Sequence, residues 1–330
     1  MRNCKRFCFS LVFLFVFATS FCDTLTIMSF NLNGTNSSHR MKEKSRWAED
    51  IAAIISQANA DIVLLQEVSI ELDKRLDTEY FKNPKKDNVL DFFIRELKNG
   101  KWEYCTSADY ILRKNMSIDG RTYKSGNKTQ NNAVLYNESK LKANDQKKML
   151  NFDTFKDSKY KFDKNSVQVI EFEERATRQK FIVMNVHLPY SDIDSYTKDL
   201  DTLERLYASQ KLKMGVIVGG DFNTHREALT KRNFDNVDGT TNWYYNFNFG
   251  LLTTIAVRNS KTFAFANAYD HFIYNKKIKE EKITQRVAIP TKDTSLSHVK
   301  IGNNTFYNSK DFYNRVSDHY PIVFEFSVIN

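Results

Sequence analysis

The order of strand-like and helix-like segments is the feature that most restricts the fold of this chain. An apolar, strand-like run at 25–33 precedes helical spacing at 46–58 and a second buried-type strand at 60–68, which together form a β-α-β opening. Further strands are expected at 131–137, 166–174, 179–189, 215–223, 268–275 and 319–326, with helices at 87–100 and 193–212. This alternation predicts an α/β protein.

The 330-residue chain shows no internal repeat, proline-rich linker or second compositional zone. Its 41% of hydrophobic residues excludes a disordered polymer, and its length is sufficient for one large core. We therefore expect a single folded domain. The stretch 224–262 is rich in Asn and aromatic residues, and there we expect loops with one short helix.

The first 22 residues have the order of a secretory signal. Basic residues precede an apolar run at 7–17 that is short for a membrane-spanning helix, and small residues follow it. We expect a signal peptide at 1–22 and a mature domain at 23–330. Two outcomes remain open: simple export to a secreted or periplasmic location, or acylation of Cys22 that tethers a lipoprotein to the cell surface.

Cysteine usage and charge add two limits. The expected mature chain keeps Cys105 and, depending on the cleavage point, Cys22, so it has no disulfide framework. The formal net charge of +9 loses three basic residues with the signal and becomes +6. This charge suits a polyanionic partner such as nucleic acid or anionic lipid, and equally a solvated lysine-rich surface.

Polar residues stand at the ends of the expected strands, where a buried and unpaired carboxylate or amide would be costly. Each alone could be a cap or turn residue, but strand ends at one edge of a sheet converge in space. They combine oxygen ligands with two histidines and no cysteine, which suits a hard divalent cation such as Mg²⁺ and acid–base catalysis rather than structural zinc. The set is Asn31, Glu67, His187, Asp221, Asn223, Asp270, Asp318 and His319.

Six short motifs resemble those of the endonuclease/exonuclease/phosphatase superfamily, and most closely its deoxyribonuclease I-like branch. They are SFNLN, DIVLLQEV, NVHLPY, GGDFNT, YDHFIY and VSDHYPIVFEF, in the family's order between residues 29 and 326. The resemblance implies a four-layer sandwich of two packed mixed β-sheets flanked by helices. It also implies metal-dependent cleavage of phosphate esters at one rim of the sandwich.

The same resemblance implies a metal site and a general base. Glu67 would be the main metal carboxylate, with Asn31 and Asp318 completing or orienting the site. His319 would take a proton from the attacking water, and Asp270 would orient that histidine. Because successive residues of an extended chain point in opposite directions, Asp318 can face the metal while His319 faces the water.

Three further residues match the nuclease branch. His187 corresponds to a histidine expected to be the general acid for the leaving oxygen. Asp221 and Asn223 correspond to a pair that holds the phosphate and the nucleophile in line. Positioning and charge neutralisation of this kind supply most of the catalysis in phosphoryl transfer.

The sequence departs from the branch at two positions. Gln130 and Asn165 stand where the branch has a glutamate that supports the histidine equivalent to His187 and an arginine that contacts phosphate. We therefore expect a less basic His187, and DNA contacts from Lys128 or Lys164 instead.

The segment GRTYK, with Arg121 and Tyr123, resembles the arginine and tyrosine loop with which this branch enters the DNA minor groove. The other histidines match no catalytic position, and we expect surface or loop roles for them. They are His39, His225, His271 and His298. His271 adjoins Asp270, but on an extended strand it should point away from the site.

These features predict a secreted or surface-tethered phosphodiesterase, a nuclease of low sequence specificity that cleaves DNA with Mg²⁺. Mn²⁺ is an alternative metal and Ca²⁺ an additional structural ion. We expect a monomer without a protein partner, in contact with a membrane only through a lipid anchor. Two other interpretations stay open: a sphingomyelinase-like phospholipid phosphodiesterase or phosphatase of the same fold, and a catalytically inactive binding protein.

Overall fold

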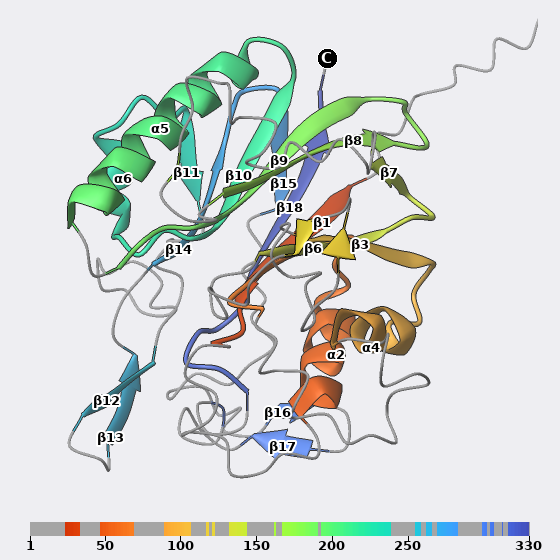
Figure 1. Ribbon diagram of the computed structural model, residues 1–330. Coiled ribbons are helices and arrows are strands. Elements are labelled where there is room, and N and C mark those ends of the chain that lie inside the picture. Colours follow the sequence, from red (N-terminus) through yellow and green to blue (C-terminus); the bar gives the residue numbers. More distant parts are fainter. Residues whose placement is uncertain are drawn as a thin grey trace, which may run out of the picture.

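The structure is a computed structural model of the chain (Figure 1). It describes residues 24–33, 47–68, 89–106, 117–118, 121–122, 132–143, 162, 167–190, 193–238, 255–258, 262–265, 269–282, 299–301, 304–306, 312 and 316–329. None of the described helices is long and apolar enough to cross a membrane.

The first of two six-stranded sheets has a parallel pair at its centre. Its strands, in spatial order, are β15 (Ile278–Lys282), β18 (Ile322–Val328), β1 (Leu25–Asn31), β2 (Ile62–Gln66), β6 (Ala133–Asn137) and β3 (Trp102–Thr106). Strands β1 and β2 are parallel, and their neighbours β18 and β6 run antiparallel to them. The first sheet is therefore mixed.

The second sheet repeats this plan. Its order is β11 (Asn236–Asp238), β14 (Asp270–Tyr274), β10 (Gly215–Asp221), β9 (Lys180–His187), β8 (Val167–Glu174) and β7 (Leu141–Ala143). Again the central pair, β9 and β10, is parallel, and β8 and β14 flank it in antiparallel orientation. Parallel neighbours need a long crossover connection, and in the part of each connection that the structure describes a helix fills that role.

Those crossover helices bury one face and end at recognisable signals. Helix α2 (Trp47–Ala58) joins β1 to β2, and it ends where Asn59 takes a left-handed backbone with φ of 50°. Helix α5 (Ile193–Lys211) joins β9 to β10, and its leucines Leu200, Leu203 and Leu206 are buried at helical spacing. Helices α4 (Val89–Glu96) and α6 (Arg226–Thr230) lie beside α2 and α5, respectively.

The helices and sheets form four layers, as Figure 1 shows. Three hydrophobic clusters lie between these layers. One cluster packs α2 and α4 against the first sheet, and another packs α5 against the second sheet. The central cluster joins the sheets through ring contacts such as Phe181 to Phe326 and Phe272 to Phe324, each with centroids 5.6 Å apart. The four-layer α/β sandwich of two mixed sheets flanked by helices is thus confirmed.

On the face of each sheet that lines this central space, the side chains change from apolar to polar along the strands. Because side chains alternate in a strand, residues two apart share a face. Ile27 of β1 and Ile217 of β10 are in the central apolar cluster, whereas four residues later on the same faces stand Asn31 and Asp221. The sandwich is therefore apolar in the middle and polar at one rim.

Short or charged strands account for most differences from the sequence-based expectations. The stretch 224–262 contains the expected short helix, α6, but also β11 and β12 (Ile255–Arg258), which pairs with β13 (Thr262–Phe265). Strands β3, β7 and β15 were not expected. Strand β15 lies at the edge of the first sheet, where charged side chains can face water. Its sequence, IKEEK, is therefore mostly charged and has no apolar run that would predict a strand.

Candidate active site

Three candidate residues of the second sheet stand in one row at the rim. The strand registers place His187 directly opposite Asp221 across the parallel pair, and Asp221 directly opposite Asp270 across the antiparallel pair. All three side chains lie on the inner face, since they continue the alternation of the central cluster. Asp270 is fully buried and Asp221 is 1% exposed.

Two glycines before Asp221 permit this close approach of strands. Gly220 has φ of 144°, and a Cβ atom there would lie 2.1 Å from the backbone oxygen of Val186. A Cβ atom on Gly219 would meet the ring of Phe272 at 2.5 Å. The GGD sequence therefore lets β10 carry its carboxylate between β9 and β14, where a residue with a side chain would be strained.

Asn31, at the end of β1, connects the two sheets. Its Nδ2 donates to Asp221 Oδ2 at 3.0 Å and to Glu67 Oε1 at 3.3 Å. Its Oδ1 accepts a hydrogen bond from the backbone N–H of Asn33 at 2.8 Å. The amide is fully buried, so these bonds fix its orientation and hold one carboxylate of each sheet at the rim.

Two site residues have left-handed backbones. Glu67, just after β2, has φ of 53°, and Asn223, just after β10, has φ of 50°. For a non-glycine residue this conformation costs on the order of 1–3 kcal/mol and clusters at functional sites. Glu67 Oε1 lies 3.8 Å from His187 Nε2, while Asn223 donates through its backbone N–H to Asp221 Oδ1 at 2.8 Å and through Nδ2 to the Leu188 carbonyl at 2.7 Å.

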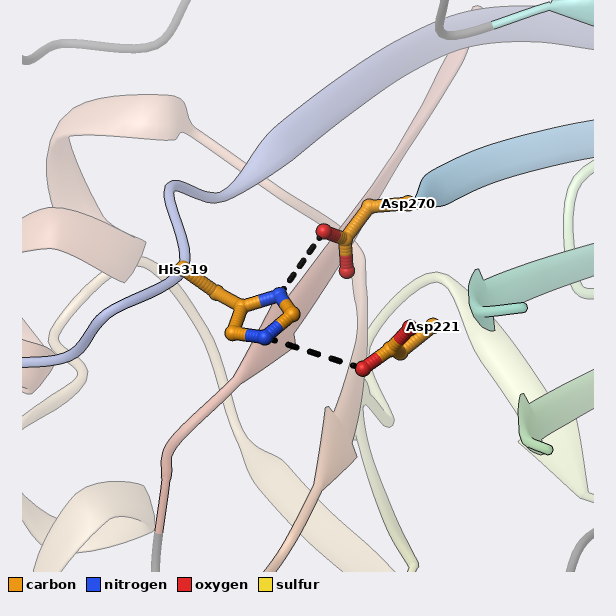
Figure 2. A group of neighbouring side chains, drawn as sticks. All are labelled: Asp221, Asp270 and His319. Carbon is orange, nitrogen blue, oxygen red and sulfur yellow. Dashed lines mark hydrogen bonds and ion pairs between the residues drawn. The ribbon is translucent and has the colours of Figure 1, made fainter. Parts of the chain in front are cut away.

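His319 lies between the carboxylates of the second sheet, as Figure 2 shows. Its Nδ1 is 2.9 Å from Asp270 Oδ2, and its Nε2 is 3.7 Å from Asp221 Oδ2. Burial by itself opposes the charged imidazolium, but Asp270, Asp221 and Asp318 together outweigh it and raise the pKa of His319 well above its ordinary value. The arrangement is that of an imidazole oriented by a buried carboxylate.

Asp221 is held by contacts from both sheets. Burial raises its pKa above the ordinary value, and the neighbouring Asp270 carboxylate adds to this, while His319 and His187 act in the opposite direction. Oδ2 of this carboxylate lies 3.7 Å from His319 Nε2 and 3.8 Å from His187 Nε2. One carboxylate oxygen is therefore within reach of both imidazoles.

The donor set fits a hard divalent cation. Ligand atoms of Asp221, Asp270 and His319 lie within 4.8 Å of one another and could hold an ion. Glu67 and Asp318 add two half-buried carboxylates, so the site has more acidic groups than its two histidines can neutralise. Oxygen ligands dominate and no thiolate is present among these residues, which is the preference of Mg²⁺, Mn²⁺ or Ca²⁺.

Three residues outside the sequence-based set help to build the site. Ser317 donates from Oγ to the Asn31 carbonyl at 2.7 Å and accepts from the His319 backbone N–H at 3.1 Å. Gln66 and Asn185 are joined by a 2.7 Å hydrogen bond between the sheets, directly before Glu67 and two residues before His187. Their inward parity in strands β2 and β9 is the sequence signal that could have identified them.

The remaining predictions have mixed outcomes. His271 points away from the site, as expected, but a surface or loop role is wrong, because it is fully buried with Nε2 2.7 Å from the Thr224 carbonyl. Within the described part of the chain, His187 Nδ1 has no hydrogen-bond partner. The backbone of Arg121 lies in β5 (Arg121–Thr122). The following lie outside the described residues: Tyr123, Lys128, Lys164, Gln130, Asn165, His39 and His298.

Comparison with known proteins identifies this arrangement. The model of the Endonuclease/Exonuclease/phosphatase family matches residues 28–319, which span every candidate catalytic and metal residue. The chain belongs to the endonuclease/exonuclease/phosphatase family. Members of this family are phosphoric-ester hydrolases and generally depend on a divalent metal. No curated protein sequence matches the chain.

Solved structures share the fold of this family member. An endonuclease/exonuclease/phosphatase family protein from Bacteroides thetaiotaomicron is similar with a TM-score of 0.53 and 16% identity, over 93% of this chain and 98% of that one. ANGEL2, a 2′,3′-cyclic phosphatase in complex with adenosine-2′,3′-vanadate, is similar with a TM-score of 0.53 and 13% identity, over 92% of this chain and 96% of that one. TDP2 from C. elegans is similar with a TM-score of 0.51 and 16% identity, over 92% of this chain and 75% of that one.

Proposed function

We propose that this protein is an exported, divalent-metal-dependent phosphodiesterase that hydrolyses nucleic acid, and that its substrate is DNA. The observation that carries the proposal is the position of His319, whose two ring nitrogens face Asp270 at 2.9 Å and Asp221 at 3.7 Å. Such a pair can take a proton from water beside a carboxylate that positions the reacting groups.

His319 acts as the base through Nε2. A cation bound among these carboxylates would oppose the rise in the pKa of His319 and favour the neutral imidazole. In that form Nδ1–H donates to Asp270, which leaves the lone pair on Nε2. That atom faces Asp221, whose carboxylate is held in place by Asn31 and Asn223. A water molecule beside Asp221 is therefore oriented by the carboxylate and deprotonated by the imidazole.

His187 serves the leaving oxygen. Its Nε2 is 3.8 Å from the same Asp221 oxygen and from Glu67, so a phosphate seated beside Asp221 has an imidazole near both its entering and its leaving oxygen. One N–H of the Asn223 side chain is used by the Leu188 carbonyl. The second N–H has no partner among the described residues, and we assign it to a phosphate oxygen.

We assign the cation to Glu67, with Asn31 and Asp318 beside it. Binding between Asp270 and His319 would displace the proton that joins them, and with it the orientation of the base. Glu67 stands just after β2, and its Oε1 accepts from the buried Asn31 amide at 3.3 Å, which holds this carboxylate at the rim. A bound cation at this position supplies charge neutralisation for the phosphate.

A substrate panel tests the function. The purified protein is incubated with plasmid DNA, RNA and sphingomyelin, each with Mg²⁺, Mn²⁺, Ca²⁺ or EDTA. We expect cleavage of DNA with Mg²⁺, loss of cleavage in EDTA, and no hydrolysis of sphingomyelin. Hydrolysis of sphingomyelin alone would replace the proposal with the phospholipid alternative, and the absence of all hydrolysis would support an inactive binding protein.

Localisation is tested separately. We expect an exported product cleaved near Cys22, because a basic and apolar segment precedes it. Labelled palmitate distinguishes the two outcomes: incorporation that is lost in Cys22→Ser indicates a surface lipoprotein, and no incorporation indicates simple export. A full-length product inside the cell would contradict both.

A further inference from the structure

Three aromatic rings gather next to the candidate active site. Tyr190 and Tyr269 have ring centroids 6.2 Å apart, and His225 lies 5.2 Å from Tyr269 on the same measure. Tyr190 is 72% exposed, His225 is exposed and Tyr269 is half-buried. We call these three residues the aromatic shelf.

Each ring of the shelf comes from a segment that carries a site residue. Tyr190 follows His187 by three residues, Tyr269 precedes Asp270 by one, and His225 follows Asn223 by two. The segments are tied together by backbone bonds: Leu188 N–H donates to the Asp221 carbonyl at 3.0 Å, and Phe222 N–H to the Tyr269 carbonyl at 2.8 Å. The backbone segments that carry the three rings are therefore tied to the segments that carry the site residues.

Electrostatics also place the shelf beside the site. Burial raises the pKa of Tyr269, and the neighbouring Tyr190 and the Asp221 carboxylate contribute to the increase. Asp221 is thus close enough to act on this phenol. His225 is the N-cap residue of α6, but its side chain makes no capping hydrogen bond. Its ring is therefore not needed to cap the start of that helix.

Exposure of Tyr190 differs from ordinary surface exposure. Leu212, which is 80% exposed after α5, shows that single apolar side chains at the surface need no functional reason. Tyr190 instead makes a tilted contact with a second ring that contacts a third, and most of its own surface stays exposed to solvent. Prearranged aromatic faces beside a phosphate-binding site are the means by which proteins hold unpaired bases.

We propose that the aromatic shelf stacks an unpaired nucleobase adjacent to the phosphate that is cut, which makes single-stranded nucleic acid the preferred substrate class. This inference rests on the proposed hydrolysis of nucleic acid. In a duplex both faces of each base are covered by its neighbours, so only an unpaired or splayed base can reach the ring of Tyr190. Every base has such a face, which leaves sequence specificity low.

A membrane is a less suitable occupant of the shelf. All three members of the shelf carry polar atoms, so the shelf is not an apolar surface of the kind that inserts into lipid. A nucleobase is neutral and flat, and its phosphate would be received by the site itself. The chemistry is shared by DNA and RNA, so both are tested.

The experiment compares Tyr190→Ala with Tyr190→Phe, which keeps the ring, and with Leu212→Ala, which removes an equally exposed side chain. Leu212 precedes β10, and the start of this strand at Gly215 is about 20 Å along the strand from Asp221. Substrates are short single-stranded DNA and RNA oligonucleotides with one cleavable linkage, flanked by nucleobases or by abasic residues, and the matching duplexes. Binding to sphingomyelin vesicles is measured in parallel.

With normal bases we expect Tyr190→Ala to raise KM by about 5- to 150-fold, the equivalent of ~1–3 kcal/mol for one stacked base, with kcat little changed. Tyr190→Phe keeps the ring but loses the hydroxyl contact with Tyr269, so its KM should stay close to that of the wild type and far below that of Tyr190→Ala. Leu212→Ala should behave as wild type, and on abasic substrates the effect of Tyr190→Ala should vanish. Equal KM values for Tyr190→Ala and wild type on single strands would overturn the inference while nuclease activity stands. So would a Tyr190→Ala defect confined to vesicle binding, whereas a wild type that cuts no nucleic acid would refute the proposed function itself.

Discussion

Replacement of Asn185 by alanine should loosen the sandwich directly beneath the candidate active site. Asn185 is fully buried in β9, and its side chain crosses to the other sheet. Nδ2 donates to the carbonyls of Leu65 and Ala133, both at 3.0 Å, and Oδ1 accepts from Gln66 Nε2 at 2.7 Å. The substitution removes all three bonds at once.

The magnitude follows from these bonds. A typical intramolecular hydrogen bond contributes about 0.5–1.5 kcal/mol net, so three bonds correspond to roughly 1.5–4.5 kcal/mol. The partners left behind in Asn185→Ala are buried, which favours the upper half of that range. We therefore expect the free energy of unfolding to fall by about 3 kcal/mol or more.

Urea unfolding of Asn185→Ala, followed by circular dichroism, measures this loss. The matched control is Asn233→Ala, which removes the same side chain at the surface, where it donates to Glu204; its loss should stay within about 0.5 kcal/mol. Because Asn185 is two residues before His187, and its partner Gln66 directly precedes Glu67, activity should fall as well. A loss no larger than that of the control would refute a role for Asn185 in joining the sheets.

Three further predictions concern other parts of the structure. Gly220→Ala should destabilise the protein by more than about 3 kcal/mol in the same urea experiment, since strain at φ of 144° adds to a clash with Val186; wild-type stability would contradict the close approach of β9 and β10. Glu67→Gln should keep the fold by circular dichroism but lose activity by orders of magnitude, with only partial recovery in excess Mg²⁺, and full activity would remove Glu67 from the metal site. Burial raises the pKa of Cys105 to about 12, so an alkylating reagent should not label the folded protein there at neutral pH but should label it in urea; rapid labelling of the native protein would contradict its burial.

Much of the fold could be predicted because its central strands are buried on both faces. Strands β1, β2, β9 and β10 are near-continuous apolar runs, and the helices between them have clear periodicity. Edge strand β15 could not be found in this way, since its sequence IKEEK reflects solvent on its outer side. Short strands such as β7, with three residues, carry too little pattern to be detected.

The site was predictable only as far as its residues stand at strand ends. The polar terminal residues of β1, β9 and β10 gave Asn31, His187 and Asp221. The inward face of Asn185 could be predicted from alternation in β9, but its bond to Leu65 depends on how the two sheets are stacked. The bond of Ser317 to Asn31 depends on the pairing of β1 with β18. Local patterns do not contain that information, which is also why His271 was expected at the surface although it is buried.

The hydrogen-bonded pair of His319 and Asp270 is the centre of the proposed mechanism, and a double-mutant cycle tests it most directly. Rates of DNA cleavage are measured for His319→Ala, Asp270→Asn and the double variant, with circular dichroism to verify folding. Loss of a positioned acid or base typically costs about 10²–10⁴-fold, so His319→Ala should lose at least that much. Because the two residues act as a unit, the double variant should be hardly worse than His319→Ala alone. Losses that multiply would show that they work separately, and activity retained in His319→Ala would contradict the account.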